Sequence, residues 1–151
     1  PVPRGSVPLR SLLVDVLAET AHLAVDRGLA VDFAEGPELP VQGNAEALAI
    51  LLRNLLVNAF RYATEGSTVS ITLGGNDGPR LEICNACPAL STSEFQQIRQ
   101  RFYRVPGSGG EGAGLGLSII ARIADLHGAA FDEVPGEDGT GFCARVAFSA
   151  Q

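Results

Sequence analysis

Apolar residues recur at steps of three and four along three stretches of the chain, which is the spacing of one face of an α-helix. The first stretch begins at Leu9 and ends near Gly28. The second follows Asn44, a residue type that caps helices well, and continues to about Ala63. The third covers residues 117–126. We therefore expect three main helices, each with one buried face.

Shorter segments alternate apolar and polar residues, as β-strands do. They are residues 29–33, 68–73, 80–85, 129–134 and 142–148. The turn-forming sequence GGNDGP joins the second to the third, and PGEDGTG joins the last two. Strands that are grouped in hairpins, rather than alternating strictly with helices, favour an α+β fold. We expect a two-layer sandwich in which the three helices cover a mixed sheet of five strands.

The composition excludes several classes of function. The 151 residues correspond to one domain, and all eleven basic residues are Arg, because the chain contains no Lys. Without Lys there is no P-loop, no eukaryotic-type protein-kinase centre and no Schiff-base chemistry. The net charge of −6 disfavours nucleic-acid binding. The sequence also lacks the GxSxG and HExxH patterns of serine hydrolases and zinc proteases.

The first seven residues are set apart from the predicted fold. They include VPRGS, which resembles the remnant of a thrombin site from an expression vector but could equally be a native linker. We therefore assign residues 1–7 to a linker or remnant and residues 8–151 to the domain. The absence of Met indicates a fragment of a longer chain, and no apolar run is long enough to predict a membrane span.

The three cysteines do not suggest a disulfide framework, because their number is odd. Cys84 and Cys87 form a CxxC pair, but no second pair completes a zinc site. We expect Cys84 and Cys143 to be small apolar side chains on strands.

A stretch rich in Gly, GSGGEGAGLG at residues 107–116, leads into the third predicted helix. It could form a flexible lid, a phosphate cradle or a surface loop. Gly112, Gly114 and Gly116 would allow close backbone approach to phosphate oxygens. The start of the following helix also favours an anion.

The second helix carries two amides, Asn54 and Asn58, one helical turn apart, with Arg61 and Tyr62 nearby. Amides on a face otherwise made of Leu are costly unless they bond a partner. An amide oxygen can ligate Mg²⁺, Arg61 can pair with phosphate, and Tyr62 can offer its ring to a base. The alternative is that the two Asn residues cap a neighbouring loop.

Four motifs follow one another in a fixed order: NLLVNAFRYA at 54–63, RFYR at 101–104, GAGLGLSI at 112–119 and DGTGF at 138–142. They resemble the asparagine box, the phenylalanine box, the second glycine box and the closing Gly-Thr turn of one family. That family is the ATP-binding catalytic domain of bacterial sensor histidine kinases, within the superfamily of gyrase, heat-shock chaperone, histidine kinase and MutL ATPases. The resemblance covers about residues 8–148 and implies a Bergerat-type fold with a Gly-rich ATP lid.

The resemblance implies a role for each matching residue. Asn58 would ligate Mg²⁺, Asn54 would lie near the transferring phosphate, and Arg104 would reach the terminal phosphate. Asn54 and Arg104 are therefore the catalytic candidates. The other implied contacts with ATP are Arg61 to phosphate, Tyr62 beside adenine, the lid residues Gly112, Gly114, Leu115, Gly116 and Leu117, and Thr140 near adenine.

The family's first glycine box is altered in this chain, because it aligns with NACPA at residues 85–89. Asn85 stands where the family has an Asp that reads adenine. Asn85 can still accept a hydrogen bond through its amide oxygen, and Asn85→Asp is expected to tighten ATP binding. The altered box also leaves an alternative open, a degenerate nucleotide-binding regulatory module without kinase activity.

The resemblance implies a histidine protein kinase domain of a two-component system. It would bind ATP or ADP with Mg²⁺ and donate the γ-phosphoryl group to a His on a separate dimerisation domain, so the fragment alone should not autophosphorylate. Neither His22 nor His127 has the sequence context of the acceptor. The implied partners are the phosphoacceptor domain and a response regulator, with no nucleic acid. The implied location is the cytoplasmic side of an inner-membrane sensor protein.

Overall fold

The computed structural model describes residues 4–87, 113–136 and 141–149, with the backbone alone described over 113–117. In chain order, its elements are β1 (Gly5–Pro8), α1 (Leu9–Asp26), β2 (Ala30–Phe33), β3 (Pro40–Gly43), α2 (Ala45–Tyr62), β4 (Thr68–Gly74), β5 (Arg80–Asn85), α4 (Ala113–Leu126), β6 (Ala130–Pro135) and β7 (Phe142–Ala147).

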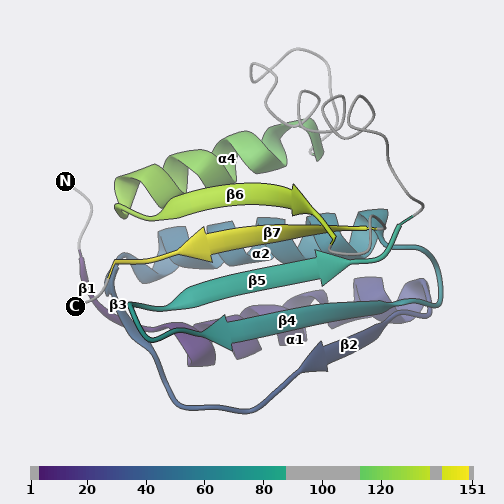
Figure 1. Cartoon of the computed structure of the whole chain (residues 1–151), viewed down its shortest axis with the longest axis horizontal. Coiled ribbons are helices and arrows are strands. Elements are labelled where there is room, and N and C mark those ends of the chain that lie inside the picture. The colour runs from purple at the N-terminus through teal and green to yellow at the C-terminus, as the bar shows by residue number, and fades with distance from the viewer. Residues whose placement is uncertain (1–3, 88–112, 137–140, 150–151) are drawn as a thin grey trace.

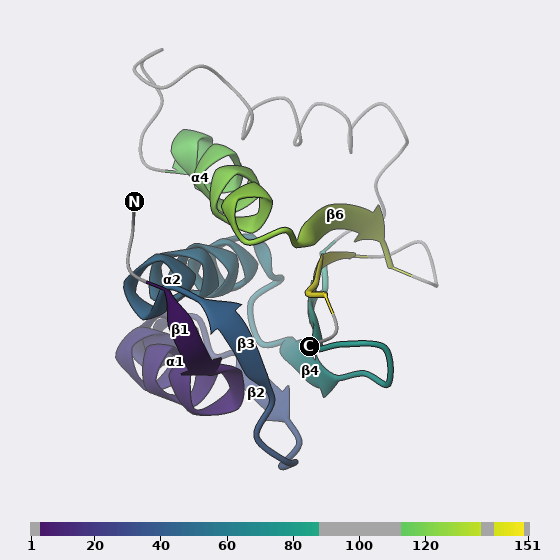
Figure 2. The ribbon, with the colours of Figure 1, turned by 90° about the vertical axis from the view of Figure 1, so that its left-hand side faces the viewer.

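The described strands form a five-stranded mixed sheet in the order β2-β4-β5-β7-β6 (Figure 1). β2 lies parallel to β4, and the other neighbours are antiparallel. Among the described residues, three helices lie on one face of this sheet, with α2 between α1 and α4 (Figure 2). The predicted α+β two-layer sandwich is therefore confirmed.

A second, two-stranded sheet is formed by β1 and β3, which the alternation of apolar and polar residues did not predict. Val7 on β1 lies opposite Val41 on β3, and both side chains are buried in the core. The exclusion of residues 1–7 from the fold therefore does not hold for residues 5–7. Each of the two strands has only four residues and contains Pro, which hides them from an alternation pattern.

The core is built around α2. Its apolar stripe is buried as the periodicity predicted, with at most 2% of each side chain exposed for Leu48, Leu51, Leu52, Leu55 and Leu56. Alternate residues of β4, β5 and β7 face this stripe and are buried in turn. Asn44 caps the helix as predicted, because its side chain accepts a hydrogen bond from the Ala47 N–H at 2.9 Å.

Cys84 on β5 and Cys143 on β7 lie opposite each other on the uncovered side of the sheet and form a disulfide, with their Cα atoms 4.0 Å apart. The prediction that they are separate apolar side chains is wrong. The odd number of cysteines was misleading because the third, Cys87, follows the end of β5 and is free. The register between two strands decides which cysteines lie opposite each other, and the number of cysteines gives no information about that register.

The C-terminal end of α2 is held by Arg27, the residue that follows α1. Its Nη1 donates to the carbonyl oxygens of Phe60, Arg61 and Ala63, at 2.8, 2.9 and 2.6 Å. The last carbonyl groups of a helix have no partners within the helix. The guanidinium therefore satisfies them and opposes the negative end of the helix dipole.

We expect Arg27→Ala to lower the free energy of unfolding by about 1.5–3 kcal/mol, the usual value of hydrogen bonds from a charged group. Arg53→Ala is the matched control. Arg53 forms an exposed ion pair with Glu19 at 2.9 Å, and such pairs contribute about 0–1 kcal/mol. Urea denaturation measures both variants, and equal losses would contradict the capping role of Arg27.

Candidate functional site

Asn54 and Asn58 lie one turn apart on α2 but in different surroundings. Asn58 is buried, with 8% of its surface exposed, whereas Asn54 is half-buried and its Nδ2 donates to the Ile50 carbonyl oxygen at 2.8 Å. Asn58 Nδ2 is shielded from solvent and has no hydrogen-bond partner in the described part of the chain. The alternative to ligand binding was that the two Asn residues cap a neighbouring loop, and neither Nδ2 atom bonds to a loop that the structure describes. A buried amide in this state costs free energy until a ligand engages it.

Asn58 shares a small cavity with Asn85, the last residue of β5. Asn85 is 4% exposed, lies on the helix-covered side of the sheet as predicted, and donates from Nδ2 to the Ala86 carbonyl oxygen at 3.3 Å. The cavity measures about 10 Å³. We call the residues that line it the pocket floor: Leu55, Asn58, Ala59, Ile83, Asn85, Glu133, Phe142 and Ala144.

Of the pocket floor, only Asn58 and Asn85 were predicted as site residues, so Glu133 on β6 and Phe142 on β7 are additions from the structure. Glu133 is 6% exposed. It lies two residues after Phe131, which packs against the core, so both side chains belong to the helix-covered face of β6. The same alternation is present in the sequence and could have marked Glu133 as an inward-facing acid.

The backbone at the start of β7 comes close to Asn85. Gly141 has a φ of +71°, a conformation that favours Gly, and its N–H donates to the Cys87 carbonyl oxygen at 3.1 Å. A Cβ atom at this position would collide with the Asn85 carbonyl oxygen. Gly141 therefore permits the contact that closes the floor beside Asn85. Burial raises the pKa of the neighbouring Cys87 thiol, which disfavours a reactive thiolate there.

Arg61 and Tyr62 do not line the pocket floor. Arg61 is exposed and borders a different cavity, of about 310 Å³, together with Asp26 and Arg27 at the end of α1. Tyr62 is half-buried and packs against the core. Their contacts with phosphate and adenine stay predictions.

The helix that follows the Gly-rich stretch begins earlier than predicted. α4 starts at Ala113, so Gly114, Leu115, Gly116 and Leu117 belong to the helix. Gly has low helix propensity, which hides this start in the sequence. The first N–H groups of a helix lack partners within it, and this end remains suited to an anion. Arg104, Gly112 and Thr140 lie outside the described residues.

Both histidines have contacts within the domain. His127 Nδ1–H donates to the Ile123 carbonyl oxygen at 2.8 Å, and its Nε2 accepts from the Asn44 N–H at 3.1 Å. This ring therefore ties the end of α4 to the start of α2. His22 Nδ1–H donates to the Glu19 carbonyl oxygen at 3.1 Å, within α1.

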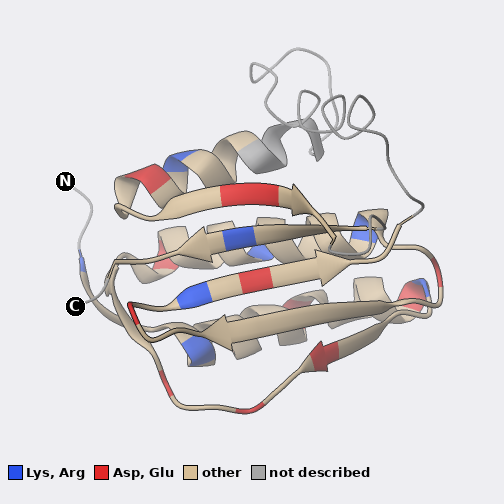
Figure 3. Ribbon diagram, in the orientation of Figure 1, with Lys and Arg blue, Asp and Glu red and all other residues tan. Residues whose placement is uncertain are grey.

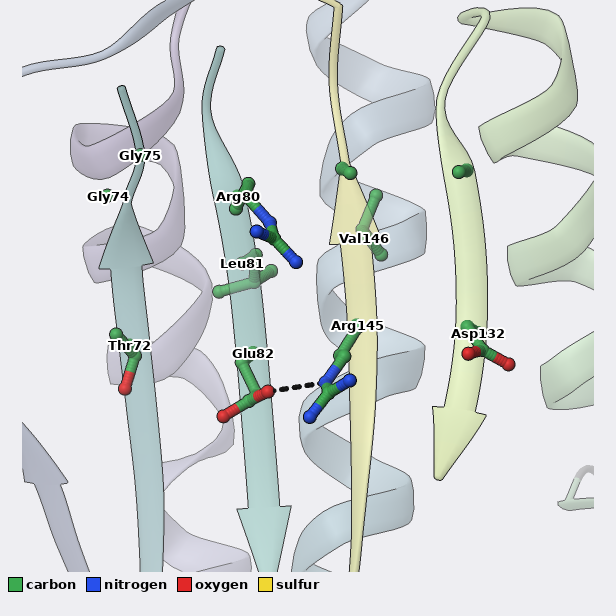
Figure 4. Close-up of a pocket in the computed structure, with 11 residues that line it drawn as sticks. Thr72, Gly74, Gly75, Arg80, Leu81, Glu82, Asp132, Arg145 and Val146 are labelled. Atoms are coloured by element: carbon green, nitrogen blue, oxygen red, sulfur yellow. Dashed lines mark hydrogen bonds and ion pairs between the residues drawn. The ribbon is translucent and has the colours of Figure 1, made fainter. Parts of the chain in front are cut away.

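Strands β5, β6 and β7 carry charged residues (Figure 3). A larger cavity, of about 570 Å³, lies on the uncovered face of the sheet (Figure 4). Arg145 Nε donates to Glu82 Oε2 at 2.6 Å across the registered strands β7 and β5. Arg80 and Asp132 also line this cavity. The sheet separates it from the pocket floor, and its described lining includes none of the predicted site residues.

In this α+β sandwich, the central helix α2 brings the buried amide of Asn58 beside Asn85 at the end of β5. Residues 43–150 match the family described as histidine kinase-, DNA gyrase B- and HSP90-like ATPase. The chain belongs to this family, and the resemblance inferred from the motifs is confirmed.

Nearly the whole chain is similar in sequence to parts of sensor histidine kinases. Sensor protein QseC of Escherichia coli strain K12 is 35% identical over 145 residues, which are 95% of this chain and 31% of QseC. Sensor protein kinase PmrB of Pseudomonas aeruginosa is 34% identical over 142 residues, 93% of this chain and 30% of PmrB. The solved cytoplasmic segment of histidine kinase QseC has a TM-score of 0.73 at 28% identity, covering 98% of this chain and 79% of the segment. This chain thus corresponds to their ATP-binding catalytic domain and spans less than a third of either curated relative.

We expect Asn58→Leu to raise the free energy of unfolding of the ligand-free domain by about 1 kcal/mol, because it replaces a buried, incompletely bonded amide with an apolar group of similar volume. The midpoint of thermal unfolding should rise by about 2–4 °C. Asn54→Leu, in which the lost amide is half-exposed and already bonded, should give no such rise. A lower midpoint for Asn58→Leu would mean that the amide is satisfied without ligand.

Proposed function

We propose that the domain binds ATP with Mg²⁺ and donates its γ-phosphoryl group to a His on a separate dimerisation domain, as the kinase domain of a two-component sensor. The observation that carries this proposal is Asn58, a buried amide in the same pocket floor as Asn85, whose Nδ2 has no hydrogen-bond partner among the described residues. Buried polar groups normally have partners, so one without a partner indicates a ligand. Membership of the ATPase family supports ATP as that ligand.

The side chain of Asn58 suits a Mg²⁺ site. Mg²⁺ prefers oxygen ligands, and it is usually held by one or two protein groups together with phosphate oxygens and water. Asn58 would supply an amide oxygen, and Asn54, one turn earlier, would lie toward the phosphates. When bound, the ion would neutralise charge on the transferring phosphate.

The pocket floor supports the adenine base in this proposal. A cavity of about 10 Å³ has room for roughly one water, so a purine would lie over the floor rather than inside it. Ile83 and Phe142 would contact the ring, and Asn85 would contact its polar edge. The proposal also retains the family roles of Arg61, Tyr62, Arg104, Gly112, Gly114, Leu115, Gly116, Leu117 and Thr140.

Transfer to His is favoured over hydrolysis by the residue one turn before Asn58. In transfer, the γ-phosphorus bonds to an imidazole nitrogen while its bond to the β–γ bridging oxygen breaks, which releases ADP. Attack by water would need a general base, and this position holds Asn54, whose amide donates to Ile50 and cannot take a proton. The relatives are sensor kinases, and nothing in the comparisons supports the non-catalytic alternative.

The remaining partners in this proposal are the phosphoacceptor domain and a response regulator, and the net charge of −6 does not favour nucleic acid. Among the described helices, none has the length and apolar character to cross a membrane. We place the domain on the cytoplasmic side of an inner-membrane sensor protein, in line with the cytoplasmic segment of QseC.

Calorimetric titration with ATP and ADP, with and without Mg²⁺, tests the proposal. Nucleotide should bind more tightly with Mg²⁺, and the absence of binding under both conditions would contradict it. The domain alone should take up no label from γ-labelled ATP, because the acceptor lies elsewhere. Label on His22 or His127 would instead place the acceptor within this domain.

We expect Asn58→Ala to weaken ADP binding in Mg²⁺ by about ten- to a hundred-fold, as for the loss of a contact of about 1.5–3 kcal/mol to a charged group. Arg53→Ala, which removes an exposed ion pair on another face of α2, should bind like the unmodified domain. In EDTA, all three proteins should have similar affinities. An unchanged affinity of Asn58→Ala in Mg²⁺ would remove Asn58 from the metal site.

A further inference from the structure

Glu133 is a buried acid in the pocket floor that the mechanism above does not use. It is 6% exposed, and most of the floor around it is apolar, including Ile83, Phe142 and Ala144. Glu is rarely buried so deeply, because desolvation of a carboxylate is costly. The side chain also brings to the floor a charged hydrogen-bond acceptor, which an apolar residue at this place would lack.

The strand ladders place Glu133 and Asn85 on two sides of the same floor. Glu133 on β6 is registered with Ala144 on β7, and Ala144 is registered with Ile83 on β5. Asn85 lies two residues after Ile83 and therefore on the same face of the sheet. The carboxylate from β6 and the amide from β5 thus both border the cavity.

We propose that Glu133 accepts the hydrogen bond of the adenine amino group, a contact for which Asn85 offers only a neutral acceptor. This inference rests on the proposed function. The polar edge of adenine presents an amino donor beside a ring-nitrogen acceptor. A carboxylate only accepts, whereas the Asn85 amide can also donate, so the two side chains together complement both groups. A hydrogen bond to a carboxylate is about twice as strong as a neutral one.

The proposal reverses the effect expected for Asn85→Asp from the sequence. With Glu133 present, Asn85→Asp would place two carboxylates in one floor, and like charges in a shared site oppose each other. Asn85→Asp alone should therefore weaken ADP binding. The double variant Asn85→Asp with Glu133→Val has one carboxylate in the floor, on β5 instead of β6. It should regain much of the affinity for ADP.

The test is calorimetric titration, in Mg²⁺, with ADP and with purine riboside diphosphate, which lacks the amino group. The unmodified domain should prefer ADP by about ten-fold or more, as for one charge-assisted hydrogen bond. Glu133→Val should lose this preference, and Glu133→Gln should keep part of it through a neutral acceptor. Asp132→Asn, on the uncovered face of the same strand, is the matched control and should leave the preference unchanged.

The outcomes separate this inference from the proposed function. Equal binding of the two diphosphates by the unmodified domain, or an unchanged preference in both Glu133 variants, would overturn the role of Glu133 and leave ATP binding in place. Tighter ADP binding by Asn85→Asp alone would also overturn it. If neither diphosphate binds, the proposed function fails and this inference fails with it. Thermal unfolding checks each variant, and Glu133→Gln retains nearly the native shape if Glu133→Val does not fold.

Discussion

The burial of α2 is the constraint on which the other parts of the domain depend. The helix lies between α1 and α4 and against the sheet, so its Leu residues are enclosed on several sides (Figure 2). Each fully buried Leu contributes roughly 1.5–3 kcal/mol, and together they fix the rotation of the helix about its axis. The two ends are fixed separately, the first by His127 through Asn44 and the last by Arg27.

This fixed rotation determines which α2 side chains reach the sheet. It turns Asn58 inward with Leu55 and Ala59, and it leaves Arg61 on the side of α1. The pocket floor therefore contains polar groups that a core selected for stability alone would not contain. The domain tolerates them because the surrounding apolar core is large, and sites of this kind are where binding and stability compete.

Much of the fold could be predicted from the sequence because its main signals are local. Helical periodicity indicated α1 and α2, and alternation with turn residues indicated the hairpins. Asn58 was found because it is an amide on a helix face otherwise made of Leu, and Asn85 was found through the resemblance to the family's first glycine box.

The features that the sequence did not reveal depend on which segments become neighbours. The disulfide needs the register of β5 against β7, and the place of Glu133 needs β7 to insert between β5 and β6. The β1–β3 pair consists of short strands far apart in the chain, where alternation carries little information. The start of α4 was hidden because Gly opposes a helix locally, while the fold extends the helix through it.

The strand order also has a consequence for how the domain folds. β5 gains its second neighbour only when β7, the last strand in the described part of the chain, adds beside it, and the Cys84–Cys143 contact spans a sequence separation of 59. Contacts of such separation require the closure of a long loop before they contribute stability, which makes their formation slow. When synthesis has reached only the end of β5, the chain already contains both amides of the pocket floor, Asn58 and Asn85. It still lacks Phe142 and Ala144, which line the same cavity from β7. The floor can be completed only after the last strand has been synthesised.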